Sequence, residues 1–224
     1  MYTPQIINSK LSLVEVDDSN DCINNKLYWD IGEPDQNLIS WLMCQTNFPT
    51  TVLELGCGSG DNAVWLAEQG CQVTAVDFHN SAITKTKQLA EQHKVKINVI
   101  KQDLIKDAWI DQKFDLVFDR GYFHTLNADR NDMIQFISNL KNCLNANGMW
   151  VSLIGNKDPY KNGVGVEWFL SANDIVSVVD PELQILKLKA ITGDCISECK
   201  MSGWLLVSCL RTQETLKISE LLPS

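Results

Sequence analysis

Two hydrophobic periods alternate along most of the chain. Five short apolar runs predict buried strands, and the stretches between them carry apolar residues at helical spacing. The runs lie at 51–55, 72–76, 97–100, 114–118 and 149–154. The helical patterns cover 35–44, with Pro34 in the first turn, then 62–69, 81–93 and 129–144, the last closed by Gly148. Regular strand–helix alternation builds a parallel sheet between helices, so the chain predicts an α/β fold.

The last third of the chain departs from this alternation. Ser171–Asp174 resembles a capping box and predicts a helix to about Val179. Two strands follow at 183–191 and 204–210 without a helix between them, which predicts an antiparallel pair at the sheet edge. The expected fold is therefore doubly wound and Rossmann-like. Its seven-stranded, mostly parallel sheet has an antiparallel last strand and helices on both faces.

Length and composition are those of one globular domain. The chain has 224 residues, of which 45% are apolar and 21% charged, enough to bury a core without disulfides. A polar, turn-like stretch precedes the first helical pattern. We therefore expect an N-terminal arm or lid over 1–33 and a single domain over 34–224.

Charge and cysteine content narrow the class of partner. Acidic residues number 28 against 19 basic ones, giving a net charge of −9, which disfavours nucleic acid and anionic membranes as partners. The eight cysteines include no CxxC pair, so we expect free thiols and no metal site. With no leader-like or membrane-spanning run, the expectation is a cytoplasmic protein, either a monomer or a weak homodimer.

A glycine-rich segment carries the most chemistry. The sequence ELGCGSG at 54–60 follows a predicted strand and opens a helix, where backbone N–H groups can meet a ligand. A dinucleotide fingerprint would place its third glycine at 61, but Asp61 stands there and would repel a pyrophosphate. Asp77 ends the next strand, where an acid can accept ribose hydroxyls. The pattern favours a nucleoside without phosphates over NAD.

Four segments carry a family resemblance. Glu54–Gly60, Val73–Asp77, Gln102–Leu104 and Phe114–Asp119 occur in this order, and together they resemble the class I S-adenosylmethionine-dependent methyltransferases. Trp29–Pro34 (WDIGEP) and Asp119–His124 (DRGYFH) further resemble the thiopurine S-methyltransferase and halide/thiol methyltransferase group.

The resemblance implies a site for S-adenosylmethionine and its product S-adenosylhomocysteine, without a metal. Asp77 would accept the ribose hydroxyls, Phe78 would flank the adenine, and Asp103 would accept from the adenine amino group. The carboxyl or carbonyl of Asp119 would face the cationic end, and Trp29 would cover the cofactor. The implied cofactor-binding residues are Trp29, Glu54, Gly56, Cys57, Gly58, Gly60, Asp77, Phe78, Asp103, Leu104 and Asp119.

The loop glycines and three of the other residues also have a structural interpretation. The glycines can form a tight strand–helix turn with no ligand, and Asp77 can be the N-cap of the following helix. Asp103 can be an ordinary loop acid, and Trp29 can be a hydrophobic anchor of the arm. Both interpretations stay open at this point for the glycines, Asp77, Asp103 and Trp29.

His124 is the candidate catalytic base, since imidazole suits proton removal near neutral pH. The alternative is a structural histidine at a strand end. His79 and His93 lie on or near a solvated helix and receive no role. With one candidate base, we expect a small-molecule acceptor, with a thiol or another soft nucleophile favoured. The alternatives are a protein or other macromolecule methyltransferase and a non-catalytic S-adenosylmethionine-binding module.

Overall fold

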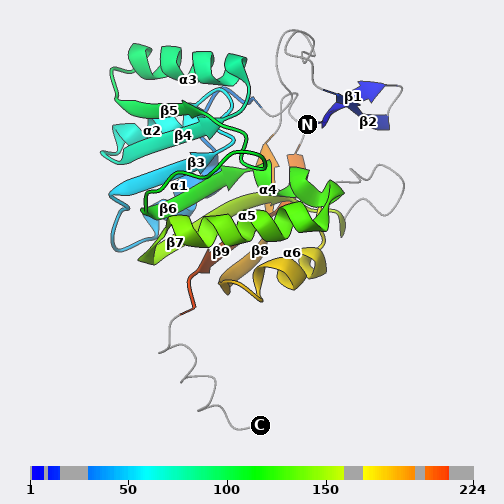
Figure 1. Cartoon of the computed structure of the whole chain (residues 1–224). Helices are drawn as coiled ribbons and strands as arrows, with labels where there is room; N and C mark the ends of the chain where they lie inside the picture. Colours follow the sequence, from blue (N-terminus) through cyan, green and yellow to red (C-terminus); the bar gives the residue numbers. More distant parts are fainter. Residues whose placement is uncertain (1, 8–9, 16–29, 159–168, 195–199, 212–224) are drawn as a thin grey trace.

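The computed structural model describes residues 2–7, 10–15, 30–158, 169–194 and 200–211 (Figure 1). A seven-stranded sheet has the order β5-β4-β3-β6-β7-β9-β8. Its strands are β3 (Thr51–Leu55), β4 (Gln72–Asp77), β5 (Ile97–Lys101), β6 (Phe114–Arg120), β7 (Leu144–Gly155), β8 (Gln184–Asp194) and β9 (Lys200–Cys209). The first five pair in parallel, while β9 runs antiparallel to both β7 and β8. The predicted fold class is confirmed, with β9 inserted so that β8 forms the edge.

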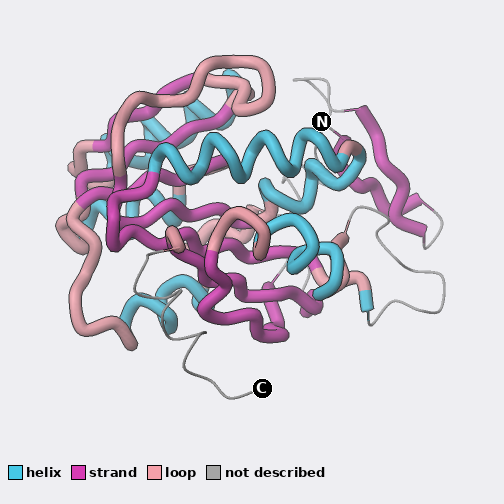
Figure 2. Tube along the Cα trace, turned by 60° about the horizontal axis from the view of Figure 1, so that its bottom comes forward, coloured by secondary structure: helices cyan, strands magenta, loops and turns pink. Residues whose placement is uncertain are grey.

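Helices cover both faces of the sheet (Figures 1 and 2). They are α1 (Gln36–Met43), α2 (Asp61–Glu68), α3 (Asn80–Gln92), α4 (Tyr122–Thr125), the short 3-10 helix η1 (Leu126–Ala128), α5 (Arg130–Cys143) and α6 (Ala172–Val179). Apolar residues of α1 and α2 pack in one core cluster. Residues of α4, α5 and α6 pack in another, on the opposite face. The sheet is thus buried on both sides, as an α/β fold requires.

The N-terminal segment contains a separate two-stranded antiparallel sheet, β1 (Tyr2–Ile7) and β2 (Lys10–Glu15). The sequence did not predict these strands. Trp29 lies outside the described residues. The division into an arm over 1–33 and a domain over 34–224 stays a prediction.

Three local predictions were wrong. Pro34 precedes the α1 N-cap Asp35 and is not in the first turn. The helix before β7 ends at Cys143, and Gly148 lies within β7, where a Cβ would be 2.6 Å from the carbonyl oxygen of Phe114. His124 belongs to α4 and not to a strand end. At the start of α1 the boundary is local, because the side chain of the N-cap Asp35 accepts from the N–H of Asn37.

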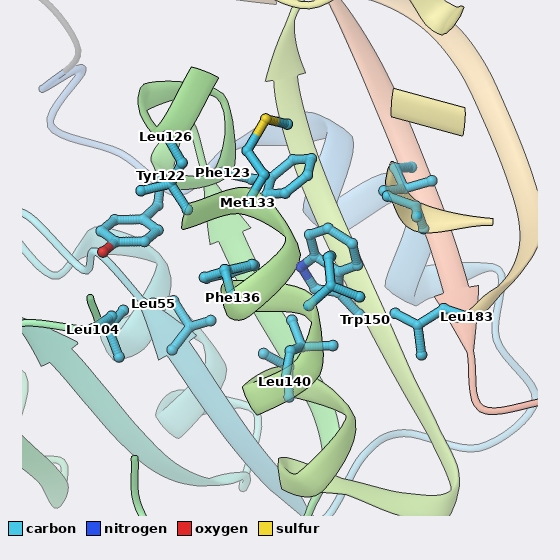
Figure 3. Packing of buried hydrophobic residues seen from close by; sticks show 14 of the residues in the cluster. Leu55, Leu104, Tyr122, Phe123, Leu126, Met133, Phe136, Leu140, Trp150 and Leu183 are labelled. Carbon is cyan, nitrogen blue, oxygen red and sulfur yellow. The ribbon is translucent and has the colours of Figure 1, made fainter. Parts of the chain in front are cut away.

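An aromatic cluster fixes α4 against the sheet (Figure 3). Phe123 of α4 lies edge-on to Trp150 of β7, with ring centroids 5.1 Å apart, and both contact Phe136 of α5. Figure 3 shows the Tyr122 ring directed the other way, with its hydroxyl pointing away from Trp150. Such aromatic pairs add about 0.5–1.5 kcal/mol beyond their buried area, so they stabilise the packing of α4 at the carboxyl end of β6.

Candidate functional site

The candidate site lies at the carboxyl ends of β3, β4 and β6. The strand order reverses between β3 and β6, and open α/β sheets bind ligands at such a switch point. The loop after β3 is tied to β4, because the N–H groups of Gly56 and Cys57 donate to the carbonyl of Val76 at 2.8 and 3.0 Å. The three predicted loop glycines therefore stand at the sheet's usual ligand position.

Backbone conformation explains why this loop needs glycine. The φ angles of Gly56, Gly58 and Gly60 are 69°, 55° and 90°, a region that L side chains rarely adopt. A Cβ on Gly56 would lie 3.0 Å from the Tyr122 ring, and one on Gly60 would lie 2.8 Å from the Thr86 side chain. Thus α3 and α4 both press against the loop and leave no room for a side chain at either position.

Thr86 of α3 contacts the glycine loop through its side chain. It is buried, and its Oγ1 donates to the carbonyl of Gly58 at 3.1 Å. The thiol Sγ of Cys57 lies 3.5 Å from Oγ1 of Thr86. Burial raises the pKa of Cys57 above its usual range. Sequence reasoning missed Thr86, since a threonine within a helix carries no local signal of a distant loop contact.

Asp77 occupies the end of β4 and is 8% exposed. Its Oδ2 accepts from the N–H of Gly58 at 3.0 Å, and its Oδ1 accepts from the N–H of His79 at 2.9 Å. The carboxylate therefore holds the glycine loop and bonds the backbone N–H of His79, which is the N-cap of α3. The alternative in which Asp77 itself is the N-cap of this helix was wrong. Its role as ribose acceptor stays a prediction, as does that of Phe78, whose ring centroid lies 3.6 Å from that of His79.

Glu54 is a buried acid beneath the loop. Its Oε1 accepts from the amide of Asn62 at 3.2 Å, and its Oε2 has no hydrogen-bond partner. Burial raises the pKa of Glu54 to about 8, and the nearby charges of Asp61 and Asp77 act in the same direction. The group therefore carries a proton at neutral pH.

A polar chain connects Glu54 to the end of β6. Asn62 donates to Glu54 and accepts, through Oδ1, from the N–H of Asp35 at 2.9 Å. The guanidinium Nε of Arg120 donates to Oδ2 of Asp35 at 2.7 Å. Four elements, β3, α2, α1 and β6, are joined by these contacts. The sequence analysis did not identify Asn62, and it included Arg120 only as part of the DRGYFH segment.

The segment before α1 also contacts the loop. The Oγ of Ser59 lies 2.6 Å from Oδ2 of Asp61 and 3.0 Å from Oδ1 of Asp30. Lys85 of α3 lies 3.8 Å from the same Asp30 carboxylate. Asp30 belongs to the WDIGEP segment, so this residue of the segment contacts the glycine loop, while the predicted covering of the cofactor by the segment stays a prediction.

Asp103 and Leu104 follow β5. Oδ1 of Asp103 accepts from the N–H groups of Ile105 and Lys106 at 3.0 and 3.3 Å. Although burial acts to raise it, these donors hold the pKa of Asp103 below its usual value. Leu104 is buried in the core cluster. The loop-acid interpretation is thus realised in the structure, and adenine recognition by these two residues stays a prediction.

Asp119 requires a correction. Its carboxyl is fully buried, with Oδ1 accepting from the N–H of Phe123 at 3.0 Å and Oδ2 from the indole Nε1 of Trp150 at 2.9 Å. Burial raises its pKa to about 6 despite these bonds. The carboxyl points into the core and holds α4, so it does not face a cationic ligand. Of the two predicted options, only the main-chain carbonyl remains.

His124 does not have the geometry of a general base. The N–H of Gly155 donates to its Nδ1 at 3.0 Å, which assigns the ring proton to Nε2. Burial, aided by the charge of Arg120, lowers the pKa of His124 to about 3. Its ring also lies edge-on to Phe169. With its lone pair already used, the imidazole fits the structural alternative better than the predicted catalytic role.

No group of three or more His, Cys, Asp or Glu side chains is placed to hold a metal ion within the described ranges. In that same part of the chain, no helix combines the length and hydropathy needed to cross a bilayer. Asp30, Asp61 and Asp77 surround the loop with negative charge, which suits a cationic nucleoside better than a phosphate ester.

Comparison with known proteins finds methyltransferases among those similar to this chain. Residues 52–148 match the family described as "Methyltransferase domain". The ubiquinone biosynthesis O-methyltransferase of Rickettsia akari is 30% identical over 162 residues, covering 64% of this chain and 62% of that protein. Its counterpart in Rickettsia felis is 30% identical over 172 residues, covering 68% of each. The ribosomal RNA small subunit methyltransferase C of Alcanivorax borkumensis is 27% identical, covering 64% of this chain and 42% of that protein.

Solved structures share the fold at low sequence identity. One, described under the conversion of a disulfide bond into a thioacetal group during echinomycin biosynthesis, has a TM-score of 0.72 at 18% identity, covering 88% of this chain and 90% of its own. The N-methyltransferase NodS from Bradyrhizobium japonicum, solved with S-adenosyl-L-homocysteine, has a TM-score of 0.62 at 18% identity, covering 79% and 85%.

Proposed function

The chain belongs to the class I S-adenosylmethionine-dependent methyltransferases, and we propose that it methylates a small molecule through a thiol or another soft nucleophile. The observation that carries the cofactor assignment is the pairing of the glycine loop with Asp77. The Asp77 carboxylate is bonded to the N–H of Gly58 at 3.0 Å, so loop and acid form one unit at the sheet's switch point. S-adenosylmethionine, when bound, supplies an electrophilic methyl group.

The protein's contribution to such a reaction is alignment and exclusion of water. The sulfonium is already a good leaving group, and orientation alone can be worth about 7–11 kcal/mol in favourable cases. Tyr122 packs on Gly56, and Phe123 is fixed by Trp150. Aromatic side chains therefore pack beside the loop at the end of β6, and we propose that they help to align the reacting groups.

The placement of the histidines supports the proposed acceptor class. The chain has three: His124 accepts from a backbone N–H, His79 contacts Asp77, and His93 lies at the far end of α3 beside Glu68. None is placed as a base at the end of β6. A thiolate or halide needs no such base, which supports a soft nucleophile, as does the resemblance of the WDIGEP and DRGYFH segments to thiol-methylating enzymes.

The relatives suggest two alternatives. The Rickettsia proteins are named as O-methyltransferases of ubiquinone biosynthesis, so a phenolic oxygen is the competing small-molecule acceptor. The Alcanivorax protein is named for ribosomal RNA. A net charge of −9 weighs against an RNA acceptor, since phosphate contacts require Lys and Arg.

Transfer of labelled methyl from S-adenosylmethionine to a panel of small thiols, catechols and amines, with ribosomal RNA as a separate arm, tests this proposal. Methylated thiols would support it. Transfer to catechol alone would favour the oxygen alternative, and transfer to RNA alone would remove the small-molecule class. Binding of S-adenosylhomocysteine without any turnover would indicate a binding module, and absence of binding would refute the cofactor assignment.

A matched pair of variants tests the role of Asp77. Asp77→Asn keeps the side-chain size and removes the charge, so S-adenosylhomocysteine affinity should fall about ten- to a hundredfold by calorimetry. Asp115→Asn is the control, because Asp115 anchors the N–H groups of Thr50 and Thr51 at the opposite end of the sheet. Equal losses in both variants would mean that the effect is structural and not local to the site.

A further inference from the structure

We propose that Asp30 is a positioning residue that retains the bound cofactor, because its carboxylate fastens residues 30–35 to the glycine loop. This inference rests on the proposed function, since it assumes that the cofactor binds at that loop. Residues 30–35 are called the strap below. The two ends of the strap are held by contacts of different strength, and this difference makes the Asp30 end the one that releases.

The Asp35 end of the strap is fixed. Asp35 is 4% exposed and is the N-cap of α1, where its Oδ1 accepts from the N–H of Asn37 at 2.9 Å. Its Oδ2 accepts from Nε of Arg120 at 2.7 Å, and its own N–H donates to Oδ1 of Asn62 at 2.9 Å. Charge-assisted bonds to a buried carboxylate are strong. We therefore expect this end to stay bound to α1, α2 and β6.

The Asp30 end is held by weaker contacts. Its Oδ1 lies 3.0 Å from Oγ of Ser59, and its Oδ2 lies 3.8 Å from Nζ of Lys85. Ser59 has a single hydroxyl proton, and Oδ2 of Asp61 lies closer to its Oγ, at 2.6 Å. Two carboxylates therefore compete for one proton, so the bond from Ser59 to Asp30 is not always made. The Lys85 side chain is 45% exposed, and ion pairs of this kind contribute little.

Gly32 gives the strap a point about which it can turn. Its φ is 72°, a conformation that favours glycine, and a Cβ added there would meet no atom of the described residues within 4 Å. Gly32 is also exposed, so its conformation is not held by packing. Hinge positions are residues that can absorb such changes in backbone angle. The Asp30 end can therefore move while the Asp35 end stays in place.

The Asp30 contact lies within the part of the loop assigned to the cofactor. Ser59 stands between Gly58 and Gly60, and the N–H of Gly58 bonds the Asp77 carboxylate at 3.0 Å. A strap held against this loop restricts the exit of a ligand that the loop binds. Asp30 thus slows dissociation of the cofactor and its product through Ser59, without taking part in methyl transfer.

The dissociation rate of S-adenosylhomocysteine, measured by stopped-flow displacement, tests the role of Asp30. Asp30→Ala removes both side-chain contacts and should raise this rate about five- to tenfold. Asp30→Asn keeps an oxygen that accepts from Ser59, so its rate should stay within about twofold of wild type. The midpoint of urea denaturation should be the same in all three proteins, which separates a positioning role from a general loss of folding.

A double variant shows whether Asp30 acts through Ser59. Ser59→Ala removes the shared hydroxyl and should also raise the dissociation rate. Adding Asp30→Ala to it should raise the rate by no more than about twofold further, because the contact is already lost. Glu33→Ala is the matched control, since it removes an exposed acid of the same strap, and it should dissociate at the wild-type rate.

Three results would overturn the inference while leaving the cofactor assignment intact. The first is a wild-type dissociation rate in Asp30→Ala, and the second is an equal rise in Glu33→Ala. The third is a double variant in which the effects of Asp30→Ala and Ser59→Ala multiply. No binding of S-adenosylhomocysteine by wild type would instead reject the proposed function.

Discussion

Glu54→Gln should stabilise the folded protein at the alkaline end of its working range. Glu54 is fully buried, and burial raises its pKa from 4.5 to about 8. Between these values the unfolded chain releases the proton while the folded protein keeps it. The free energy of unfolding therefore falls as pH rises. Glutamine resembles the protonated acid, can still accept from Asn62, and has no proton to lose.

The pH window in which Glu54 acts alone can be defined from the other shifted groups. Burial raises the pKa of Asp119 to about 6. The free energy of unfolding therefore also falls with pH because of Asp119, but only up to about pH 6. The pKa of His124 is lowered from 6.5 to about 3. His124 therefore increases the free energy of unfolding as pH rises to 6.5, and it has no effect on the pH dependence above 6.5. From pH 6.5 to 8, Glu54 should cost about 1.36 kcal/mol per pH unit, or about 2 kcal/mol in all.

Urea denaturation at pH 6.5, 7.2 and 8 measures this directly. The stability difference between Glu54→Gln and wild type should grow by about 2 kcal/mol across the window. Glu33→Gln is the control, because Glu33 is exposed, and its difference from wild type should stay constant. A Glu54→Gln difference that is the same at all three pH values would show that Glu54 is ionised in the folded protein, and the reasoning would fail.

Two further variants test the packing of the site. Gly60→Ala combines a φ of 90° with a Cβ 2.8 Å from Thr86 and should cost about 2–4 kcal/mol in urea denaturation, whereas Gly70→Ala, with a φ of 91° but open space, should cost about 1–2 kcal/mol. Equal losses would mean that α3 does not press on the loop. Trp150→Phe removes the indole donor to Asp119 and should cost about 1–3 kcal/mol; a neutral result in the same assay would show that the buried carboxyl finds another donor.

The sheet and its helices could be predicted because their signals are local. The run at 114–118 and the helical pattern at 129–144 each record burial against the neighbouring layer, and both elements appear within a few residues of the expected bounds. The capping box at Ser171 is confirmed, with Asp174 as its partner. Periodicity reports which side of an element is buried, and capping reports where it begins, so such features need no knowledge of the partner.

Boundaries set by another element were not predictable in this way. The short helix α4 follows a glycine and is held by Phe123 against Trp150, a contact between positions far apart in the sequence. Similarly, β7 begins directly after α5 because Leu144 pairs with Phe114. Neither pairing leaves a period or a cap in the sequence, so a reader of the sequence places His124 on a strand end and Gly148 after a helix.

The acids at the sheet's carboxyl edge show why residue type alone did not fix each role. Asp77 is the last residue of β4 and Asp119 the last but one of β6, and by position either carboxyl could face a ligand. The indole N–H of Trp150 and the N–H of Phe123 draw the Asp119 carboxyl into the core, while Asp77 meets Gly58 at the loop. A buried carboxyl without donors costs free energy, so the position of donors on neighbouring elements decides the orientation. The same reasoning applies to Glu54. Its Oε2 is buried without a donor, which lowers the stability of the folded protein.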